Sequence, residues 1–271
     1  MIGTRGHDLG GFMSAGTLAK KAKDRGLGSI QLVTYRSIEG VEAKAGFMSH
    51  GFAQQINRVF QNENVRIALL GCYINVPHDN LELFKEFLSY GKDFGCHIVG
   101  TETGSVNSDY SFNPENHGEE ALKQVIDKFS EMVRYGEKFG VFVGVEGVHS
   151  HIIHTPERML QLLNGVDSPN LKVIFDPVNL ITPENYLRRK EIIEQAFELY
   201  GDRIVIIHGK DFIIKNNELV MVPLGRGLMD YHHLYEVISH HKYDLDVIIE
   251  DYQGKELEDS IEFLKSVEGR C

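Results

Sequence analysis

Short runs rich in valine and isoleucine alternate along the chain with longer amphipathic stretches. This alternation is typical of a parallel sheet covered by helices. The runs predicted as strands are Ile2–Gly6, Ser29–Thr34, Arg66–Cys72, His97–Gly100, Phe142–Val145, Lys172–Phe175, Ile204–Ile207 and Asp246–Ile249. The stretches predicted as helices are Gly16–Arg25, Leu81–Phe94, Glu119–Phe139, Pro156–Leu163, Arg188–Tyr200, Tyr231–Ser239 and Glu256–Val267.

The number of strand–helix units favours a closed barrel over an open, doubly wound sheet. Eight units follow one another without a Pro-rich or Ser-rich linker, whereas an open sheet would typically use fewer strands and leave edges. The length of 271 residues also suits one barrel of roughly 250 residues. We therefore predict an α/β fold in which residues 1–271 form a single (β/α)8 TIM barrel domain. A dinucleotide-binding sheet is disfavoured because no G-x-G-x-x-G follows the first strand, and Gly225-Arg226-Gly227 comes too late and is too short.

Charge and cysteine content narrow the classes of partner and compartment. The formal net charge of −11 would repel a nucleic-acid backbone. Cys72, Cys96 and Cys271 are odd in number and lack metal-ligand spacing, which indicates a reducing compartment. No apolar run has the length of a signal peptide core or of a membrane span. We expect a cytoplasmic protein with neither nucleic-acid nor membrane partners, and the sequence leaves open whether it forms a homo-oligomer.

Four predicted strands are each followed directly by an ionisable residue: Glu146, Asp176, His208 and Glu250. In a barrel the carboxyl ends of the strands converge on one face, so these side chains would meet. Three adjacent carboxylates repel one another unless a cation neutralises them. Three oxygen ligands and one imidazole suit one divalent ion (Mn²⁺, Mg²⁺, Co²⁺ or Zn²⁺), and the absence of thiolate disfavours a purely structural zinc site.

Each of the four residues also has an ordinary structural interpretation. An acid just past a strand often caps the next helix, and Asp176 before Pro177 is a common turn beginning. A lone histidine at a strand end is more often a hydrogen-bonded core residue than a ligand. The same pattern on four successive strands is much harder to explain in this way.

The spacings between the four residues are 30, 32 and 42 positions, each about one strand–helix unit. With these spacings, and with the segments GCYIN, GTETG, FDPVN and HGKD, the sequence resembles the sugar phosphate isomerase/epimerase superfamily, the xylose isomerase-like barrels. The resemblance covers essentially the whole chain. It implies that Glu146, Asp176, His208 and Glu250 bind one metal ion, and that Glu146 and Glu250 also act as catalytic acid and base on opposite sides of a bound ketose or polyol.

The resemblance implies an isomerase or epimerase of carbohydrate metabolism. Its substrate would be a small sugar, keto-sugar or cyclic polyol, phosphorylated or not, and the proton transfer would pass through an enediolate. A dehydratase or lyase with the same metal site remains an alternative, because the same intermediate can expel a β-hydroxyl. An apurinic endonuclease-like phosphodiesterase is disfavoured, since those enzymes carry a metal-binding histidine at the place of Asn179 and the net charge opposes DNA. A barrel that binds a sugar without turnover is disfavoured by the intact quartet.

Three residues near the quartet are candidates for substrate binding. Lys210 lies two positions after His208 and would point to the same side if the strand continues, although an ion pair with Asp211 is nearly as plausible. Arg226 lies between two glycines and resembles a residue of the family's loop after strand seven; those glycines alternatively shape a turn. His149 is close to Glu146, but a histidine-rich surface loop is an equal alternative.

Three more candidates follow other strands of the predicted barrel. Glu102 ends strand four and would be a substrate or second-metal ligand, or else a cap of its loop. His7 and Tyr73, at the ends of strands one and three, would line the pocket or pack for shape alone. The long loop Ser105–Gly118 would serve as a lid.

Overall fold

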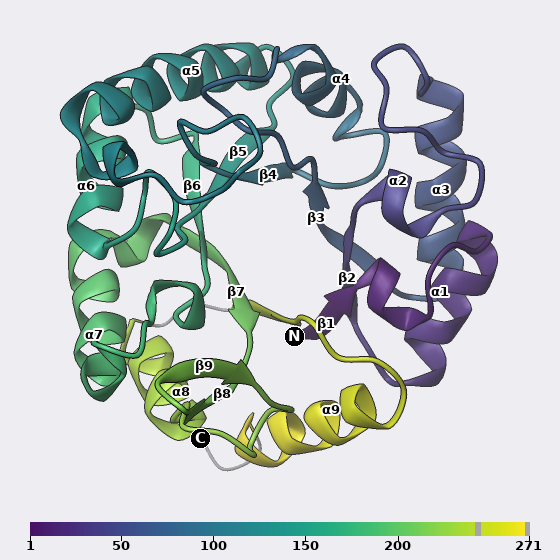
Figure 1. The fold of residues 1–271 in the computed structure, drawn as a ribbon. Coiled ribbons are helices and arrows are strands. Elements are labelled where there is room, and N and C mark those ends of the chain that lie inside the picture. The colour runs from purple at the N-terminus through teal and green to yellow at the C-terminus, as the bar shows by residue number, and fades with distance from the viewer. Residues whose placement is uncertain (242–244, 269–271) are drawn as a thin grey trace.

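A computed structural model describes residues 1–241 and 245–268, and its eight parallel strands close into a barrel. Figure 1 looks into the barrel, with the strands in an inner ring and the helices around them. The barrel strands are β1 (Ile2–Arg5), β2 (Ser29–Leu32), β3 (Arg66–Gly71), β4 (Ile98–Glu102), β5 (Phe142–Glu146), β6 (Leu171–Phe175), β7 (Ile204–Gly209) and β10 (Asp246–Ile249). Neighbours in sequence are neighbours in space, and β10 pairs with β1 to close the ring. The predicted (β/α)8 fold is confirmed.

Helices cover the outside of the barrel. They are α1 (Ala15–Asp24), α2 (Thr34–Ser37), α3 (His50–Asn62), α4 (Glu82–Tyr90), α5 (Glu119–Glu137), α6 (Pro156–Val166), α7 (Arg189–Tyr200), α8 (Tyr231–His240) and α9 (Gly254–Glu268). Several begin at the residue types that cap helices: the side chain of Thr155, for example, accepts a hydrogen bond from the backbone N–H of Arg158 at the start of α6. Buried aliphatic and aromatic side chains of the strands and helices form the main core.

The barrel interior is filled by complementary small and large residues. Gly100 and Gly144 face each other in the register of β4 and β5, and a Cβ on either would meet the Cδ1 atom of Ile174. Ile174 belongs to a separate small cluster contributed by β3, β6, β7 and β10. The interior is therefore packed, as in other such barrels, and leaves the strand ends as the place for chemistry.

Several elements are absent from the predicted set, among them helix α3 and a hairpin. Helix α3 has a strong amphipathic pattern that buries Ala53, Ile56 and Phe60. The antiparallel hairpin of β8 (Phe212–Lys215) and β9 (Glu218–Met221) follows β7 and is seen at the open end of the barrel in Figure 1. Its turn uses Asn216 and Asn217 at positive φ angles of 52° and 62°, which asparagine tolerates better than most residues.

Two further expectations concern cysteines and membranes. Cys72 and Cys96 are buried free thiols, and Cys271 lies outside the described residues. Within residues 1–241 and 245–268, no helix combines the length and apolar character that crossing a membrane requires.

Candidate metal centre and active site

The structure brings Glu146, Asp176, His208 and Glu250 together at the carboxyl ends of β5, β6, β7 and β10. One nitrogen or oxygen atom from each residue lies within 4.8 Å of those of the other three. All four residues are at most 3% exposed. Three carboxylates and an imidazole thus share one buried position, although more than 100 residues separate the first from the last.

Asp176 is oriented by the turn that follows β6. Its Oδ1 atom accepts hydrogen bonds from the backbone N–H groups of Val178 (2.9 Å) and Asn179 (3.1 Å). The other oxygen, Oδ2, is buried and forms an ion pair with Lys210 Nζ at 2.9 Å. The Asn179 side chain also donates to Glu146 Oε1 at 2.7 Å. The turn therefore holds both carboxylates and leaves one Asp176 oxygen facing the centre.

His208 is oriented by a residue on the opposite side of the barrel. Its Nε2 atom lies 2.8 Å from Gln31 Oε1, and an amide oxygen can only accept, so Nε2 carries the proton. Its Nδ1 atom faces Glu146 Oε1 at 3.1 Å and Glu250 Oε1 at 3.3 Å. The Gln31 amide in turn donates to the Tyr73 hydroxyl at 2.6 Å. Gln31 thereby fixes the ring so that Nδ1 faces the carboxylates, as an outer hydrogen bond does for a metal-binding histidine.

Two cations approach Glu250. Lys210 Nζ lies 3.0 Å from Glu250 Oε2 and 3.1 Å from Asn179 Oδ1, while Arg5 Nη1 lies 3.6 Å from Glu250 Oε2. Lys210 is only 8% exposed, so its charge interacts strongly with the carboxylates around it. It points to the same side as His208, as strand alternation predicted; its expected alternative partner, Asp211, instead accepts backbone hydrogen bonds from the following loop.

The crowding of charges shifts the pKa of several groups. Burial opposes the charged form of His208, but the charges of Glu146 and Glu250 prevail and raise its pKa to about 9. Burial raises the pKa of Asp176 to about 6. For Glu250 burial acts in the same direction, yet His208, Lys210 and Arg5 together lower its pKa to about 2. The buried carboxylates thus depend on neighbouring positive charge.

The donor set fits a divalent cation. In the described residues the buried oxygens Asp176 Oδ2 and Glu250 Oε1 are paired with charged side chains, Lys210 Nζ at 2.9 Å and His208 Nδ1 at 3.3 Å, and a bound cation would supply positive charge in the same place. One ligand atom from each of the four residues lies within 4.8 Å of the others. Oxygen and imidazole ligands without thiolate suit the harder divalent ions. The cluster could therefore hold one metal ion.

A cavity of about 460 Å³ opens beside this cluster, within the range of small-molecule sites. Four residues predicted to bind substrate line it: Lys210, Glu102, Tyr73 and His7. Glu102 pairs in register with Glu146, and burial, followed by the charges of Glu146 and Glu250, raises its pKa to about 8. Burial raises the pKa of Tyr73 well above its usual value.

The other two predicted substrate residues lie elsewhere. His149 is exposed and lines a neighbouring cavity of about 500 Å³ that also includes Lys210 and Asn179. Arg226 is not among the residues lining either cavity; its side chain is 61% exposed and pairs with Asp259 at 2.6 Å. The glycines around it shape the turn: Gly225 has a φ of +80°, and a Cβ on Gly227 would collide with Asp211 Oδ1.

The loop expected to act as a lid contributes one residue to the cavity. Tyr110 lines the wall, and the loop is held by Asn116, whose side chain donates to the backbone carbonyl of Ser150 at 2.8 Å. Sequence reasoning missed other functional candidates on other elements: Gln31, Arg5 and Arg36. Gln31 offered a signal, because it is a polar residue inside the apolar run of β2.

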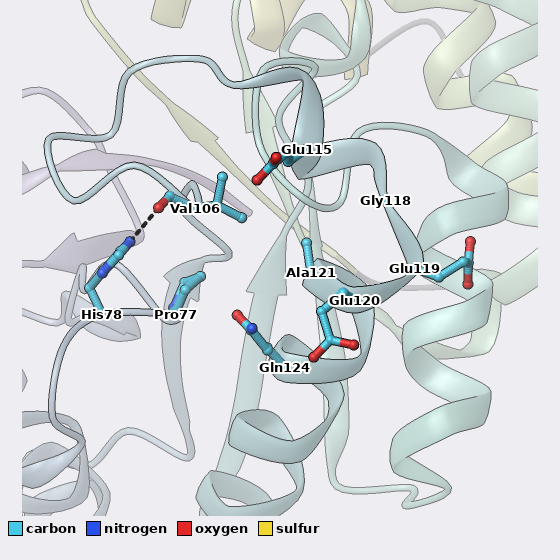
Figure 2. A pocket seen from close by; sticks show the side chains of 9 residues that line it. All are labelled: Pro77, His78, Val106, Glu115, Gly118, Glu119, Glu120, Ala121 and Gln124. Carbon is cyan, nitrogen blue, oxygen red and sulfur yellow. Dashed lines mark hydrogen bonds between the residues drawn. The ribbon is translucent and has the colours of Figure 1, made fainter.

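Another cavity lies away from the quartet. It measures about 590 Å³ and lies between the loop after β3 and the start of α5, lined by residues such as His78, Glu115 and Glu120. Figure 2 shows these side chains and the hydrogen bond from the His78 ring to the carbonyl oxygen of Val106. None of the four clustered residues lines this cavity, so its size alone does not make it the active site.

Fold and site together define a (β/α)8 barrel with a candidate metal centre at the strand ends. The chain belongs to the xylose isomerase-like TIM barrel family, whose model matches residues 19–267. This confirms the resemblance drawn from the sequence.

The chain is similar to several known proteins. An uncharacterized protein of Methanocaldococcus jannaschii is 24% identical over 219 residues, which are 80% of this chain and 68% of that protein. A solved D-tagatose 3-epimerase-like protein superposes with a TM-score of 0.75 at 18% identity, covering 98% of this chain and 96% of the other. A Mycobacterium smegmatis protein of the family, solved in complex with magnesium, gives a TM-score of 0.71 at 16% identity, with 94% and 89% covered. Other structures with this fold include sugar epimerases and a probable dehydratase, so the relatives are mostly enzymes.

The pKa of His208 predicts how a bound metal responds to pH. With a pKa of about 9 in the metal-free protein, His208 is protonated at pH 7, and a metal that binds Nδ1 must displace this proton. Affinity for Mn²⁺ should therefore rise about tenfold per pH unit between pH 7 and 9, and more steeply near pH 6, where Asp176 also titrates. Equilibrium dialysis across this range measures the slope. The His208→Asn variant should lose the slope above pH 7, and a flat wild-type profile would contradict the prediction.

Proposed function

We propose that this protein is a metal-dependent isomerase or epimerase that acts on a small sugar, keto-sugar or cyclic polyol. The observation that carries the proposal is the buried convergence of Glu146, Asp176, His208 and Glu250 within 4.8 Å, beside a cavity of about 460 Å³. Membership in a family whose solved relatives include sugar epimerases supports it. A divalent ion held there would polarise a carbonyl and its neighbouring hydroxyl and acidify the adjacent C–H bond.

The protein's own side chains have distinct roles in this proposal. Glu250, with a pKa of about 2, is a carboxylate at pH 7 and accepts the proton at one face of the substrate. Glu146 exchanges a proton at the other face. Asp176 and His208 serve as ligands, His208 held in its tautomer by Gln31. Lys210, whose ammonium already lies among carboxylates, donates a hydrogen bond to a substrate oxygen.

Deuterium exchange tests the proposal on many candidate substrates at once. The Mn²⁺-loaded protein is incubated with a panel of ketoses and keto-sugar acids in D2O, and the products are analysed by mass spectrometry and NMR. We expect metal-dependent deuterium uptake at a carbon beside the carbonyl. A product lighter by one water would assign the alternative dehydratase or lyase activity instead. No exchange across the panel with the loaded protein would contradict isomerase and epimerase activity.

A phosphodiesterase is not proposed. The position that would carry a further metal-binding histidine is Asn179, whose amide donates to Glu146 and so serves the single cluster. The net charge of −11 opposes approach of a nucleic acid.

A further inference from the structure

The cavity beside the quartet extends to a cation that the proposed chemistry does not use. Its wall includes Glu250 and Lys210, and it also includes Arg36 from the short helix α2. One small molecule in this cavity can therefore contact both the reaction centre and the Arg36 guanidinium. The volume of about 460 Å³ is sufficient for a substrate of sugar size.

Arg36 differs from the other two cations of the wall in its partners. Arg5 is bound by Asp8 at 2.8 Å and by Asp251 at 2.6 Å, and Lys210 is bound by the quartet. In the part of the chain that the structure describes, Arg36 forms no ion pair; its guanidinium stacks over the Tyr73 ring at 5.5 Å. Its five N–H donors remain free to bind an anion, and the planar guanidinium suits carboxylate and phosphate oxygens.

A second unsatisfied group lies on the same wall. The Nδ1 atom of His7 is buried without a hydrogen-bond partner, and His7 lines the cavity together with Arg36. Arg36 is close enough to His7 for their charges to interact. Because His7 lines the cavity, its imidazole is within reach of a bound ligand, and its Nδ1 atom has no competing partner among the described residues.

We propose that Arg36 and His7 form a subsite for an anionic group, carboxylate or phosphate, of the substrate. The inference rests on the proposed function, because the same molecule reaches Glu250 and Lys210 with its carbonyl end. It narrows the substrate class from neutral sugars to acidic or phosphorylated ones. Glu250 lies on the same wall as Arg36 and Lys210, so the cavity presents charges of both signs and suits a molecule with one anionic end.

Matched pairs of neutral and anionic ligands test this subsite. The probes are L-sorbose against 5-keto-D-gluconate, which differ by a carboxylate, and D-fructose against D-fructose 6-phosphate, which differ by a phosphate. Dissociation constants for the Mn²⁺-loaded protein are measured by calorimetry. We expect at least one anionic member to bind about tenfold more tightly than its neutral partner, and the pair that shows the preference identifies the kind of anion.

Substitution of Arg36 then assigns the preference to this residue. Arg36→Gln should remove the preference for the anion and leave binding of the neutral partner unchanged, whereas Arg36→Lys should retain part of it. Arg134→Gln, which removes an exposed arginine of α5, is the matched control and should change nothing. Since Arg36 is exposed, the variants should fold, which thermal unfolding checks.

Two outcomes would overturn the subsite. The first is that the wild-type protein binds the anionic and the neutral member of both pairs equally well, or binds neither. The second is that Arg36→Gln keeps the full preference for the anionic ligand. These outcomes are distinct from failure of the proposed function. The binding measurement needs no turnover, so the anion preference can be present when deuterium exchange is absent, and exchange on a neutral ketose can occur when the preference is absent.

Discussion

Glu250→Gln and Glu146→Gln are each expected to lower kcat by about 10²–10⁴-fold for the substrate that shows deuterium exchange. Glutamine keeps the size and the amide oxygen of the side chain but cannot accept a proton at neutral pH. Because His208, Lys210 and Arg5 stabilise the Glu250 carboxylate, Glu250→Gln should lower the stability of the metal-free protein while leaving it folded. The measurements are kcat, bound Mn²⁺ per chain and the midpoint of thermal unfolding.

The control for this pair of variants is Glu198→Gln, which changes an exposed glutamate of α7. Its kcat should equal that of the wild type. If both site variants keep wild-type turnover with metal bound, neither glutamate transfers the proton. If they lose both metal and turnover, the two roles are separated by restoring the metal at high concentration and measuring kcat again.

Asp211→Ala is expected to reduce the free energy of unfolding by about 3 kcal/mol or more. The Asp211 carboxylate is fully buried and accepts hydrogen bonds from the backbone N–H groups of Phe212, Gly225, Gly227 and Met229 at 2.8–3.0 Å. Each buried donor left without a partner costs about 1–3 kcal/mol. Chemical denaturation, with the midpoint and slope both recorded, measures the loss.

Two variants accompany this measurement. Asp211→Asn retains one acceptor oxygen but turns an NH2 group toward backbone donors, so it should lie between the wild type and Asp211→Ala in stability. Asp127→Ala, at an exposed position of α5, should change stability by no more than about 0.5 kcal/mol. If Asp211→Ala were as stable as the wild type, the loop would not depend on this carboxylate.

Asp211 has a structural role, which differs from the substrate-binding role that its segment HGKD suggested. From the sequence, HGKD and Gly225-Arg226-Gly227 both looked like substrate-binding segments. In the structure His208 and Lys210 lie at the reaction centre, while Asp211 and the two glycines build the turn that carries Arg226 outward to Asp259. The glycine pattern was a signal for a turn, and side-chain direction could not be read from it.

The predictions that agree best with the structure are those based on hydrophobic periodicity. Alternating apolar runs specified eight strands, and the parity of a strand placed Lys210 on the same side as His208. The positions of the four ionisable residues after their strands then followed from chain order and from the common direction of parallel strands. The roles of residues inside strands and loops were harder to predict. Gln31 stands out as a polar residue in an apolar run, but its partner His208 is 177 positions away.

By itself, the sequence determined the barrel, its strand order and the set of residues at the strand ends, because these depend on local hydrophobic period and on the direction of parallel strands. Only the tertiary structure decided which atoms face one another: the Nδ1 side of His208 toward the carboxylates, Lys210 between Asp176 and Glu250, and Arg36 on the cavity wall with no acidic partner among residues 1–241 and 245–268. The contacts among the quartet and Lys210 join residues of neighbouring barrel strands that are far apart in the sequence. Their geometry is set by packing and by loop conformation, which no local pattern encodes.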